Sequence, residues 1–310
     1  MTRSGDAGRD VSGILAGIAI IAEDRHFLVA YKPPNMPAQA DSSRDRDMLS
    51  TLKDYIKRRE RKPGNVYLAL LHRLDRPAQG LLVFAKTSKA AARLSASQRD
   101  GEWTKEYLAV VRGNARESPC GADKRNVSES DAARQGCSAV PPRRAAYACG
   151  SASASPRRAD GNEALACPAD SEENSWLAWT DLLLKDERTN SSSIVPSGTP
   201  GAKEARLSWT CAGLYAPPAG NGGGSHGVLS LARIRLGTGR SHQIRVQFSA
   251  RGLPLWGDLR YDPEQSRPGM QLALLAARLS FPHPITGECC AYTVSPPEER
   301  PWNLFGGAHS

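Results

Sequence analysis

The segment LHRLDRPAQGLLVFAKT, residues 71–87, places a cluster of charged side chains between two apolar runs. The runs, residues 66–71 and 80–85, have the composition of buried strands. A loop held between two strands commonly carries binding or catalytic residues, so Asp75 is a candidate functional carboxylate. A surface turn held by ion pairs would have the same composition. These residues taken alone therefore leave both interpretations open.

Further predicted elements flank this segment on both sides. Residues 47–61 carry apolar side chains at helical spacing and end at Lys-Pro-Gly, and residues 88–98 show a second amphipathic pattern. Both stretches are predicted helices. Alternating or apolar runs predict strands, which we place at residues 18–22, 26–31, 106–111, 227–237, 242–248, 279–281 and 291–294. We find no internal repeat among these elements.

The composition changes in the middle of the chain. Residues 114–175 are rich in Ala, Ser, Arg, Gly and Pro, with few large apolar side chains and no sustained periodicity. Such a segment cannot bury enough apolar surface to offset the entropy lost on ordering. We therefore predict a disordered insertion at 114–175 within a single domain made of 14–113 and 176–300. A disordered N-terminus, 1–13, and a C-terminal tail, 301–310, complete the prediction.

The charge balance of the chain is basic. Its 310 residues allow a substantial core, and 41 Lys and Arg against 32 Asp and Glu give a formal net charge of +9. Residues 114–175 hold eight basic and nine acidic side chains, so the surplus belongs to the predicted domain. A basic surplus suits a polyanionic partner, because Lys and Arg displace counterions from phosphates. Charge alone still allows a basic protein with no nucleic-acid role.

The apolar runs and the cysteines argue against two other classes of protein. No apolar run reaches the ~18 residues that a membrane span needs, and the best candidate, 14–22, is short and follows a mixed-charge start. The seven cysteines show no CxxC spacing, which argues against a zinc site and favours free thiols in a reducing compartment. We expect no membrane association, no metal and a cytoplasmic location.

Four more segments join residues 71–87 in a recognisable order. They are VAYKPP at 29–34, KEYLAVV at 105–111, GRSHQIRV at 239–246 with GDLRY at 257–261, and LSFPHP at 279–284 with TG at 286–287. Together the five segments resemble the signatures of the RluA-type RNA pseudouridine synthases, among them HRLDR-x-x-x-G-LL-x-x-AKT. One match would be modest support, whereas five in the same order are strong. The resemblance spans about residues 18–111 and 176–296.

The resemblance implies an α+β fold, with a long, bent, mainly antiparallel sheet, flanking helices and a central basic cleft. It also implies an enzyme that isomerises specific uridines in ribosomal or transfer RNA to pseudouridine, as a monomer without a cofactor. The reaction breaks the C1′–N1 bond, turns the uracil and rejoins it through C5. One carboxylate is needed, either as a nucleophile at C1′ or as a base at the 2′ position. The residues before the domain are too few for the S4 domain of many relatives, so we expect the catalytic domain, with or without the insertion, to recognise the target.

Three residues form the catalytic set that the resemblance implies. Asp75 is the catalytic carboxylate, and Arg245, predicted on a strand, is the cation that keeps it ionised. Tyr107 is the aromatic residue that stacks on an extruded uracil and assists proton transfer at C5. A phosphate contact is the alternative for Arg245, and a place in the core is the alternative for Tyr107.

Four further basic residues are predicted to contact RNA. Arg73 is a candidate wedge that fills the stack left by an extruded base, and Lys32, Arg76 and Arg240 are candidate phosphate contacts. A solvated surface charge is the alternative for each of these three. His72 is predicted to orient the loop and not to act as a general base.

Two other classes of function stay open, and two positions depart from the family pattern. The protein could be a non-catalytic RNA-binding protein on the same fold, or an unrelated hydrolase that uses His72 and Asp75. Gln79 stands where the family usually has a small hydroxyl residue, and Leu275 replaces a histidine that is often found there. Neither departure falls on a predicted catalytic position, so they bear on packing or on substrate choice.

Overall fold

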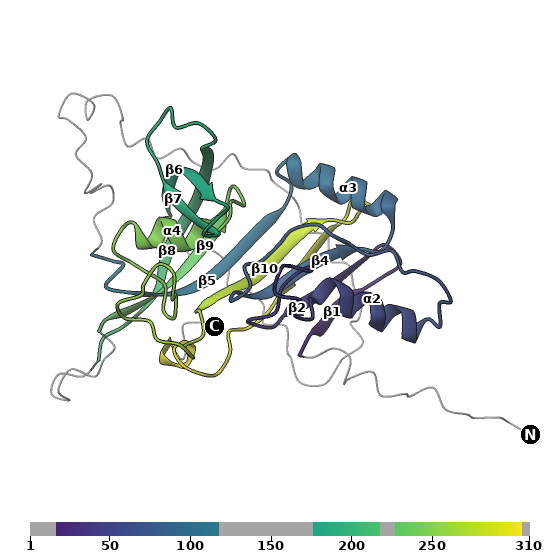
Figure 1. Cartoon of the computed structure of the whole chain (residues 1–310), viewed down its shortest axis with the longest axis horizontal. Helices are drawn as coiled ribbons and strands as arrows, with labels where there is room; N and C mark the ends of the chain where they lie inside the picture. The colour runs from purple at the N-terminus through teal and green to yellow at the C-terminus, as the bar shows by residue number, and fades with distance from the viewer. Residues whose placement is uncertain (1–16, 118–175, 218–226, 306–310) are drawn as a thin grey trace, which may run out of the picture.

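One large sheet organises the molecule (Figure 1). A computed structural model describes residues 17–117, 176–217 and 227–305, and the strands in these ranges form an 11-stranded sheet. Its order is β1-β2-β4-β10-β5-β9-β8-β6-β7, with β11 paired to β10 and β3 paired to β4 beside this path. All of the strand pairs in these ranges are antiparallel except β10 with β4, which is parallel. The strands are β1 (Ala19–Glu23), β2 (Phe27–Lys32), β3 (Ala69–Leu70), β4 (Gln79–Ala85), β5 (Thr104–Arg112), β6 (Leu177–Asp186), β7 (Ser191–Ile194), β8 (Lys203–Tyr215), β9 (Leu229–Leu236), β10 (Leu274–Pro282) and β11 (Cys289–Thr293).

Helices pack against this sheet at both of its ends. They are α2 (Met48–Arg59), α3 (Ser88–Arg99), α4 (Gln243–Ser249) and the 3-10 helix η1 (Trp302–Phe305). Figure 1 shows α2 and α3 at the end that carries β1 and β2, and α4 at the end that carries β6 to β8. The two helices predicted from apolar spacing are confirmed as α2 and α3. Each begins at a side-chain cap, since Asp47 accepts from the Ser50 N–H and Thr87 from the Ala90 N–H.

Strands from both sides of residues 118–175 share one core. β5, which precedes that segment, pairs with β9 and β10, which follow it, through Tyr107 opposite Ile234 and Ala276. The largest apolar cluster likewise joins Leu52 of α2 to Trp209 of β8. Because these contacts bury side chains from distant parts of the chain, the described residues form one body.

The strand predicted at residues 242–248 is wrong, because His242 precedes helix α4 and residues 243–248 belong to that helix. Every residue from Gln243 to Phe248 is buried. A segment that is buried on all sides has no exposed face to reveal a 3.6-residue period. The apolar residues at positions 244, 246 and 248 also alternate, which is the pattern of a strand.

Two predicted boundaries also shift. Residues 301–305 do not belong to a free tail, because Trp302 and Phe305 are buried in an apolar cluster with Trp256. Ala115 falls inside the predicted insertion but is buried, and its N–H donates to Ser230 Oγ at 2.9 Å. The packed body therefore extends to about residue 117. The predicted disordered segments, 1–13 and the remainder of 114–175, lie outside the described residues.

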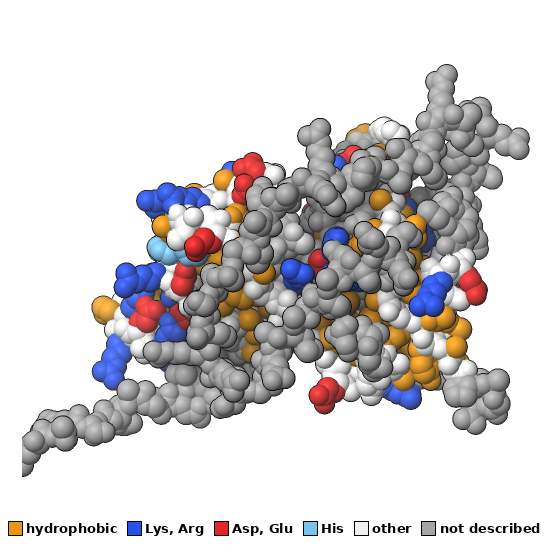
Figure 2. All heavy atoms as spheres, turned by 180° about the vertical axis from the view of Figure 1, so that it is seen from behind, with side chains coloured by type: hydrophobic (Ala, Val, Ile, Leu, Met, Phe, Trp, Pro, Cys, Tyr) orange, Lys and Arg blue, Asp and Glu red, His pale blue; other side chains and the backbone are white. Residues whose placement is uncertain are grey.

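The α+β fold class is confirmed, as a mainly antiparallel sheet with flanking helices. Within the described ranges, no helix combines the length and the apolar composition that crossing a membrane requires. The view from behind shows basic and acidic side chains intermixed at the end of the molecule that carries α3 (Figure 2). That surface is therefore not uniformly basic.

Candidate active site

A cleft of about 730 Å³ lies near the middle of the sheet. The loops after β2, β3 and β9 line it, together with β5, the end of α3 and the hairpin that joins β6 to β7. Its charged residues are mostly basic: Arg73, Arg76, Lys105, Lys185, Arg240 and Arg245, against Asp41 and Asp75. The predicted basic cleft is thus present, and it contains most of the predicted site residues.

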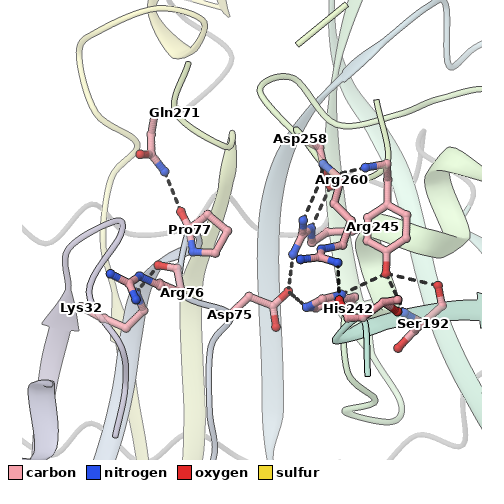
Figure 3. Close-up of polar contacts among 12 residues, drawn as sticks. Lys32, Asp75, Arg76, Pro77, Ser192, His242, Arg245, Asp258, Arg260 and Gln271 are labelled. Carbon is pink, nitrogen blue, oxygen red and sulfur yellow. Dashed lines mark hydrogen bonds and ion pairs between the residues drawn. The ribbon is translucent and has the colours of Figure 1, made fainter. Parts of the chain in front are cut away.

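The loop that carries Asp75 connects β3 to β4 and is held by backbone hydrogen bonds. The N–H of Ala78 donates to the Asp75 carbonyl at 3.0 Å, which closes the turn. Gln271 Nε2 donates to the Pro77 carbonyl at 2.6 Å, and Lys32 Nζ donates to the Arg76 carbonyl at 2.9 Å. Figure 3 shows these two bonds on the side of the loop opposite to the Asp75 carboxylate. Asp75 is therefore presented by a braced loop.

Lys32 is placed differently from the prediction that it contacts phosphate. Its side chain is fully buried, and Nζ also donates to the carbonyls of Pro33 at 3.0 Å and Met36 at 2.7 Å. Burial lowers the pKa of Lys32 to about 7, while the negative charge of Asp75 opposes this shift and the positive charge of Arg76 adds to it. With three backbone acceptors and no exposed surface, the ammonium is not available to RNA. The phosphate prediction for Lys32 is wrong, and its place is structural.

Arg245 bridges two carboxylates, as Figure 3 shows. Its Nη1 donates to Asp75 Oδ2 at 3.1 Å, and its Nε and Nη2 donate to the two oxygens of Asp258, each at 2.8 Å. The Asp258 side chain is 0% exposed and the Arg245 side chain 6%, whereas 24% of the Asp75 side chain is exposed. Burial alone would lower the pKa of Arg245, but the hydrogen bonds and charges of Asp258 and Asp75 outweigh it and raise that pKa. Arg245 is thus a permanent cation that Asp258 holds beside Asp75.

The turn before α4 aims Arg245 at the cleft. His242, which precedes the helix, has φ +53°, in the left-handed region that few side chains adopt. Gln243 closes the turn, because its Oε1 accepts from the Arg240 N–H at 3.0 Å and from Thr238 Oγ1 at 2.8 Å. Its Nε2 donates to the Arg206 carbonyl at 2.9 Å, which ties the turn to β8.

Tyr107 extends from β5 into the wall of the same cleft. Its side chain is buried in the main apolar cluster, and the residue lies opposite Ala276 of β10. Burial, followed by the negative charge of Asp75, raises the pKa of the Tyr107 hydroxyl, so the phenol stays protonated at neutral pH. The structure therefore gives Tyr107 both predicted places, in the core and at the cleft.

His242, Asp258 and Tyr261 complete the site, although the sequence reasoning assigned them no role. His242 Nε2 lies 3.8 Å from Asp75 Oδ2, and His242 Nδ1 lies 2.9 Å from the Tyr261 hydroxyl. Burial lowers the pKa of His242, Asp75 and Asp258 oppose the shift, and Arg245 and Arg260 add to it. All three residues belong to the segments GRSHQIRV and GDLRY, so the segment match was the available signal.

The other predicted RNA contacts reach the cleft in different states. Arg73 and Arg240 are exposed and line it, with Arg240 Nε donating to the Glu204 carbonyl at 2.8 Å. The Arg76 guanidinium contacts the carboxylate of Asp45, and its Nη1 lies 3.8 Å from Asp41 Oδ2. Arg76 therefore forms ion pairs with the loop after β2, whereas the guanidinium groups of Arg73 and Arg240 are exposed in the cleft.

His72 is held as a packed, neutral side chain. The N–H of Val83 donates to its Nε2 at 3.4 Å, and its ring meets the ring of Trp103 edge-on at 5.8 Å. Burial, with a smaller contribution from Lys105, lowers the pKa of His72 to about 3.

In the described ranges, no cluster of three or more His, Cys, Asp and Glu side chains is arranged to hold a metal ion.

Comparison with known proteins places this site in a family. Residues 26–250 match the family model described as RNA pseudouridylate synthase. The chain belongs to the RNA pseudouridylate synthase family. It is 26% identical over 276 residues to the ribosomal large subunit pseudouridine synthase C of Pasteurella multocida (strain Pm70), which covers 87% of this chain and 61% of that protein. It is also 26% identical over 290 residues to an uncharacterized RNA pseudouridine synthase of Bacillus subtilis (strain 168), with coverages of 94% and 76%.

A shorter match and a solved structure add to this family assignment. The ribosomal large subunit pseudouridine synthase C of Buchnera aphidicola subsp. Baizongia pistaciae (strain Bp) is 35% identical over 94 residues, or 30% of this chain and 28% of that protein. The chain thus spans less than two thirds of the length of each of these two synthase C relatives, 28% and 61%, and 76% of the Bacillus subtilis relative. The structure of Human RNA Pseudouridylate Synthase Domain Containing 1 superposes with a TM-score of 0.56 at 20% identity, covering 92% of this chain and 85% of that one. At that identity, the superposition supports the pseudouridine synthase fold.

Proposed function

We propose that this member of the family is an RNA pseudouridine synthase that isomerises uridines to pseudouridine, with Asp75 as the catalytic carboxylate. The observation that carries the proposal is the ion pair between Asp75 and Arg245 at the wall of the basic cleft. Asp75 is the more exposed partner, so it can meet a nucleoside while Arg245 stays in place. Family membership supports the same reaction.

The reaction needs a carboxylate that is charged and close to the ribose. The C1′–N1 bond breaks and a C1′–C5 bond forms, N1 gains a proton, and the proton at C5 is lost to solvent. Asp75 can serve as nucleophile at C1′ or as base at the 2′ position, and both roles require its ionised form. Arg245 places a positive charge beside the carboxylate, with Nη1 3.1 Å from Asp75 Oδ2, and so orients it. The atoms and electrons of this isomerisation balance without a redox partner or a co-substrate.

The cleft suits an extruded base and its flanking phosphates. Tyr107 offers a neutral aromatic ring beside Asp75, which is the kind of surface on which a flipped base stacks. Arg73 and Arg240 line the cleft with exposed guanidinium groups, and we propose them as RNA contacts. Arg76, now paired with Asp45, could reach phosphate only after that pair opens.

We propose ribosomal RNA as the target, with transfer RNA as the alternative. Several of the matching relatives are described as ribosomal large subunit pseudouridine synthases, which favours ribosomal RNA. Pseudouridine mapping in both RNA classes, from cells with and without the gene, tests the assignment. Loss of a site in transfer RNA alone would overturn the ribosomal target and leave the reaction standing.

Tritium release from RNA labelled with 5-³H-uridine tests the reaction and the role of Asp75 together. Wild-type protein should release tritium, whereas Asp75→Asn should bind RNA and release none, because the amide has neither the charge nor the basicity required. The variant should fold, since Arg245 keeps its two bonds to Asp258. Turnover of Asp75→Asn within tenfold of wild type would overturn the role of Asp75.

The same assay separates the two competing functions. A non-catalytic RNA-binding protein would bind RNA without releasing tritium in the wild-type form. A hydrolase would yield free uracil or cleaved RNA. The structure disfavours the hydrolase, because burial lowers the pKa of His72 to about 3, which makes it a weak base, and its Nε2 already accepts from the Val83 N–H.

A further inference from the structure

Tyr261 has a hydroxyl group that contacts three polar atoms. It accepts from the Ser192 N–H at 2.8 Å, lies 3.2 Å from the Ser192 carbonyl, and lies 2.9 Å from His242 Nδ1. Ser192 belongs to β7, so the hydroxyl is anchored on the backbone of the β6–β7 hairpin. The ring is also fixed, because the Arg245 guanidinium lies over it at 5.1 Å from its centroid.

The single proton of this hydroxyl restricts the tautomer of His242. If the phenol donates to the Ser192 carbonyl, then Nδ1 of a neutral imidazole must donate, and the Nε2 lone pair faces Asp75. If the phenol donates to Nδ1, the shorter contact, then Nε2 carries the hydrogen and points it toward the Asp75 carboxylate. A lone pair directed at a negative oxygen is repulsive, whereas an N–H is attractive. The charge on Asp75 therefore selects the Nε2–H tautomer.

The choice of tautomer matters because His242 is buried and its ring is therefore neutral. The His242 side chain is 8% exposed, and burial lowers its pKa, so the neutral ring prevails at neutral pH. The charged groups that face it are Asp75, Asp258, Arg245 and Arg260. Among these, Asp75 is the group that lies at the Nε2 atom.

We propose that His242 is a positioning residue for Asp75. Its Nε2–H points toward Asp75 Oδ2 from 3.8 Å, beyond hydrogen-bond distance, and adds an electrostatic attraction to the hydrogen bond that Arg245 donates to the same oxygen. Tyr261 holds the imidazole in the required tautomer. This inference rests on the proposed function, because it assigns a role at the same carboxylate. Asp75 Oδ2 thereby faces a hydrogen-bond donor of α4 and the imidazole of the turn that precedes it, so the second oxygen, Oδ1, is left for the nucleoside.

The arrangement also connects the rim of the cleft to the carboxylate. Lys185 and Asn190, on the β6–β7 hairpin, line the cleft, and Asn190 lies two residues before Ser192. A nucleic acid that contacts this hairpin would act on the anchor of Tyr261. Hydrogen bonds join Ser192 to Tyr261 and Tyr261 to His242, and the 3.8 Å contact of His242 Nε2 with Asp75 Oδ2 completes the path.

Two amide variants separate the positioning role from a merely structural one. Nε2 of glutamine is as many bonds from the backbone as Nε2 of histidine, so His242→Gln keeps a donor for Asp75. The side-chain amide of asparagine corresponds to Nδ1, so His242→Asn keeps the partner of Tyr261 but cannot reach Asp75. Asparagine tolerates the left-handed backbone better than glutamine, so His242→Asn should be the more stable variant.

We expect His242→Asn, the more stable variant, to react more slowly than His242→Gln. In single-turnover reactions at saturating protein, His242→Asn should react about tenfold more slowly than wild type, because Asp75 loses its electrostatic contact with the imidazole N–H. His242→Gln should stay within about threefold of wild type, and RNA affinity should change little in either variant. If His242→Asn reacts at the wild-type rate, or if His242→Gln is the slower variant, the positioning role is wrong.

A measurement that needs no activity tests the tautomer by itself. In protein with ¹⁵N-labelled histidine, the ring signals of His242, identified by their loss in His242→Gln, should report the Nε2–H form in wild type. Tyr261→Phe should shift these signals toward the Nδ1–H form or an exchanging mixture, because the donor to Nδ1 is gone. A wild-type spectrum of the Nδ1–H form would overturn the inference. Because this readout is independent of catalysis, its outcome is distinguishable from a failure of wild type to release tritium.

Discussion

Arg245 holds its two carboxylates with unequal strength. Asp258 accepts two 2.8 Å bonds from the guanidinium and two 3.1 Å bonds from the N–H groups of Arg260 and Tyr261. Asp75 receives one bond of 3.1 Å from the guanidinium. Removing one partner of a buried ion pair leaves an uncompensated charge, which is costly, so the Arg245–Asp258 pair is structural. Asp75 is the partner that can reorient toward a substrate without unpairing the arginine.

Arg245→Lys tests this division of roles. A single ammonium cannot match the planar fork that spans both carboxylates, and the buried Asp258 should hold it, so Asp75 loses its cation. Single-turnover rates at saturating protein should fall about a hundredfold, on the order of 3 kcal/mol, with little change in RNA affinity.

The matched control for this variant is Arg240→Ala. Because Arg240 is exposed at the cleft, we expect weaker RNA binding and a normal rate once RNA is bound. The slope of the logarithm of the binding constant against the logarithm of the salt concentration should fall by about one. If Arg245→Lys instead binds poorly and reacts normally once bound, Arg245 is a phosphate contact.

Lys32 supports the Asp75 loop from inside the protein. Lys32→Met should keep the volume but leave the carbonyls of Pro33, Met36 and Arg76 without their donor. Each buried unsatisfied acceptor costs ~1–3 kcal/mol, so we expect urea denaturation to show a free energy of unfolding about 3 kcal/mol lower. Lys57→Met, at an exposed position on α2, should change it by less than ~0.5 kcal/mol. A loss below ~1 kcal/mol for Lys32→Met would show that these bonds do not brace the loop.

At the scale of elements, the end of the Asp75 loop depends on a close approach between two strands. β4 begins beside β10 in the parallel contact, with Gly80 opposite Ala276. Gly80 has φ +119°, and a Cβ there would lie 2.4 Å from the Ala276 carbonyl oxygen. Only glycine fits both the backbone angle and the contact. This gives a physical reason for the glycine in the HRLDR-x-x-x-G pattern.

Gly80→Ala should therefore be strongly destabilising. The strained backbone and the clash with Ala276 together predict a loss of about 3 kcal/mol or more in the free energy of unfolding. Gly64→Ala is the control, because a Cβ at that position would meet no atom within 4 Å and its φ is ordinary. A well-folded Gly80→Ala protein of wild-type stability would show that β4 can separate from β10.

At the scale of the whole molecule, the chain on either side of residues 118–175 builds one sheet. β5 ends before this segment, and β6 begins after it, three strands away through β9 and β8. Three strand spacings and about five residues along the strands separate the two ends by roughly 20 Å. A flexible linker of about 20 residues has an r.m.s. span of about 25 Å, which is enough to join them.

Replacing residues 118–175 with such a Gly/Ser linker should leave the core folded and the reaction largely intact. The composition of this segment predicts that it contributes little packing, and Ala115, which does pack, is retained. Thermal unfolding and tritium release should both stay close to those of wild type. A large drop in melting temperature would show that the segment packs on the core.

The family, the fold class and the place of Asp75 in a loop between two strands could be predicted from the sequence, because short ordered segments carry them. LHRLDRPAQGLLVFAKT places Asp75 in a loop between strands, and capped amphipathic patterns mark α2 and α3. Such signals are local, because a helix cap and an apolar helix face each involve neighbours in the chain. Arg245 was placed beside Asp75 by resemblance alone, since 170 residues separate the two.

The tertiary structure alone decided the features that depend on contacts between distant segments of the chain. Residues 242–248 alternate like a strand, but most of them form α4, the helix that carries Arg245, and burial on every side hides its helical period. Lys32 carries a positive charge that could contact phosphate, but in the folded protein its ammonium donates to three backbone carbonyls. His242 acquires its role only when Tyr261 and the backbone of Ser192 approach it from other elements. Charge and periodicity are properties of the sequence, whereas burial and hydrogen-bond partners are set by the three-dimensional packing, and these decide which charged groups face the cleft.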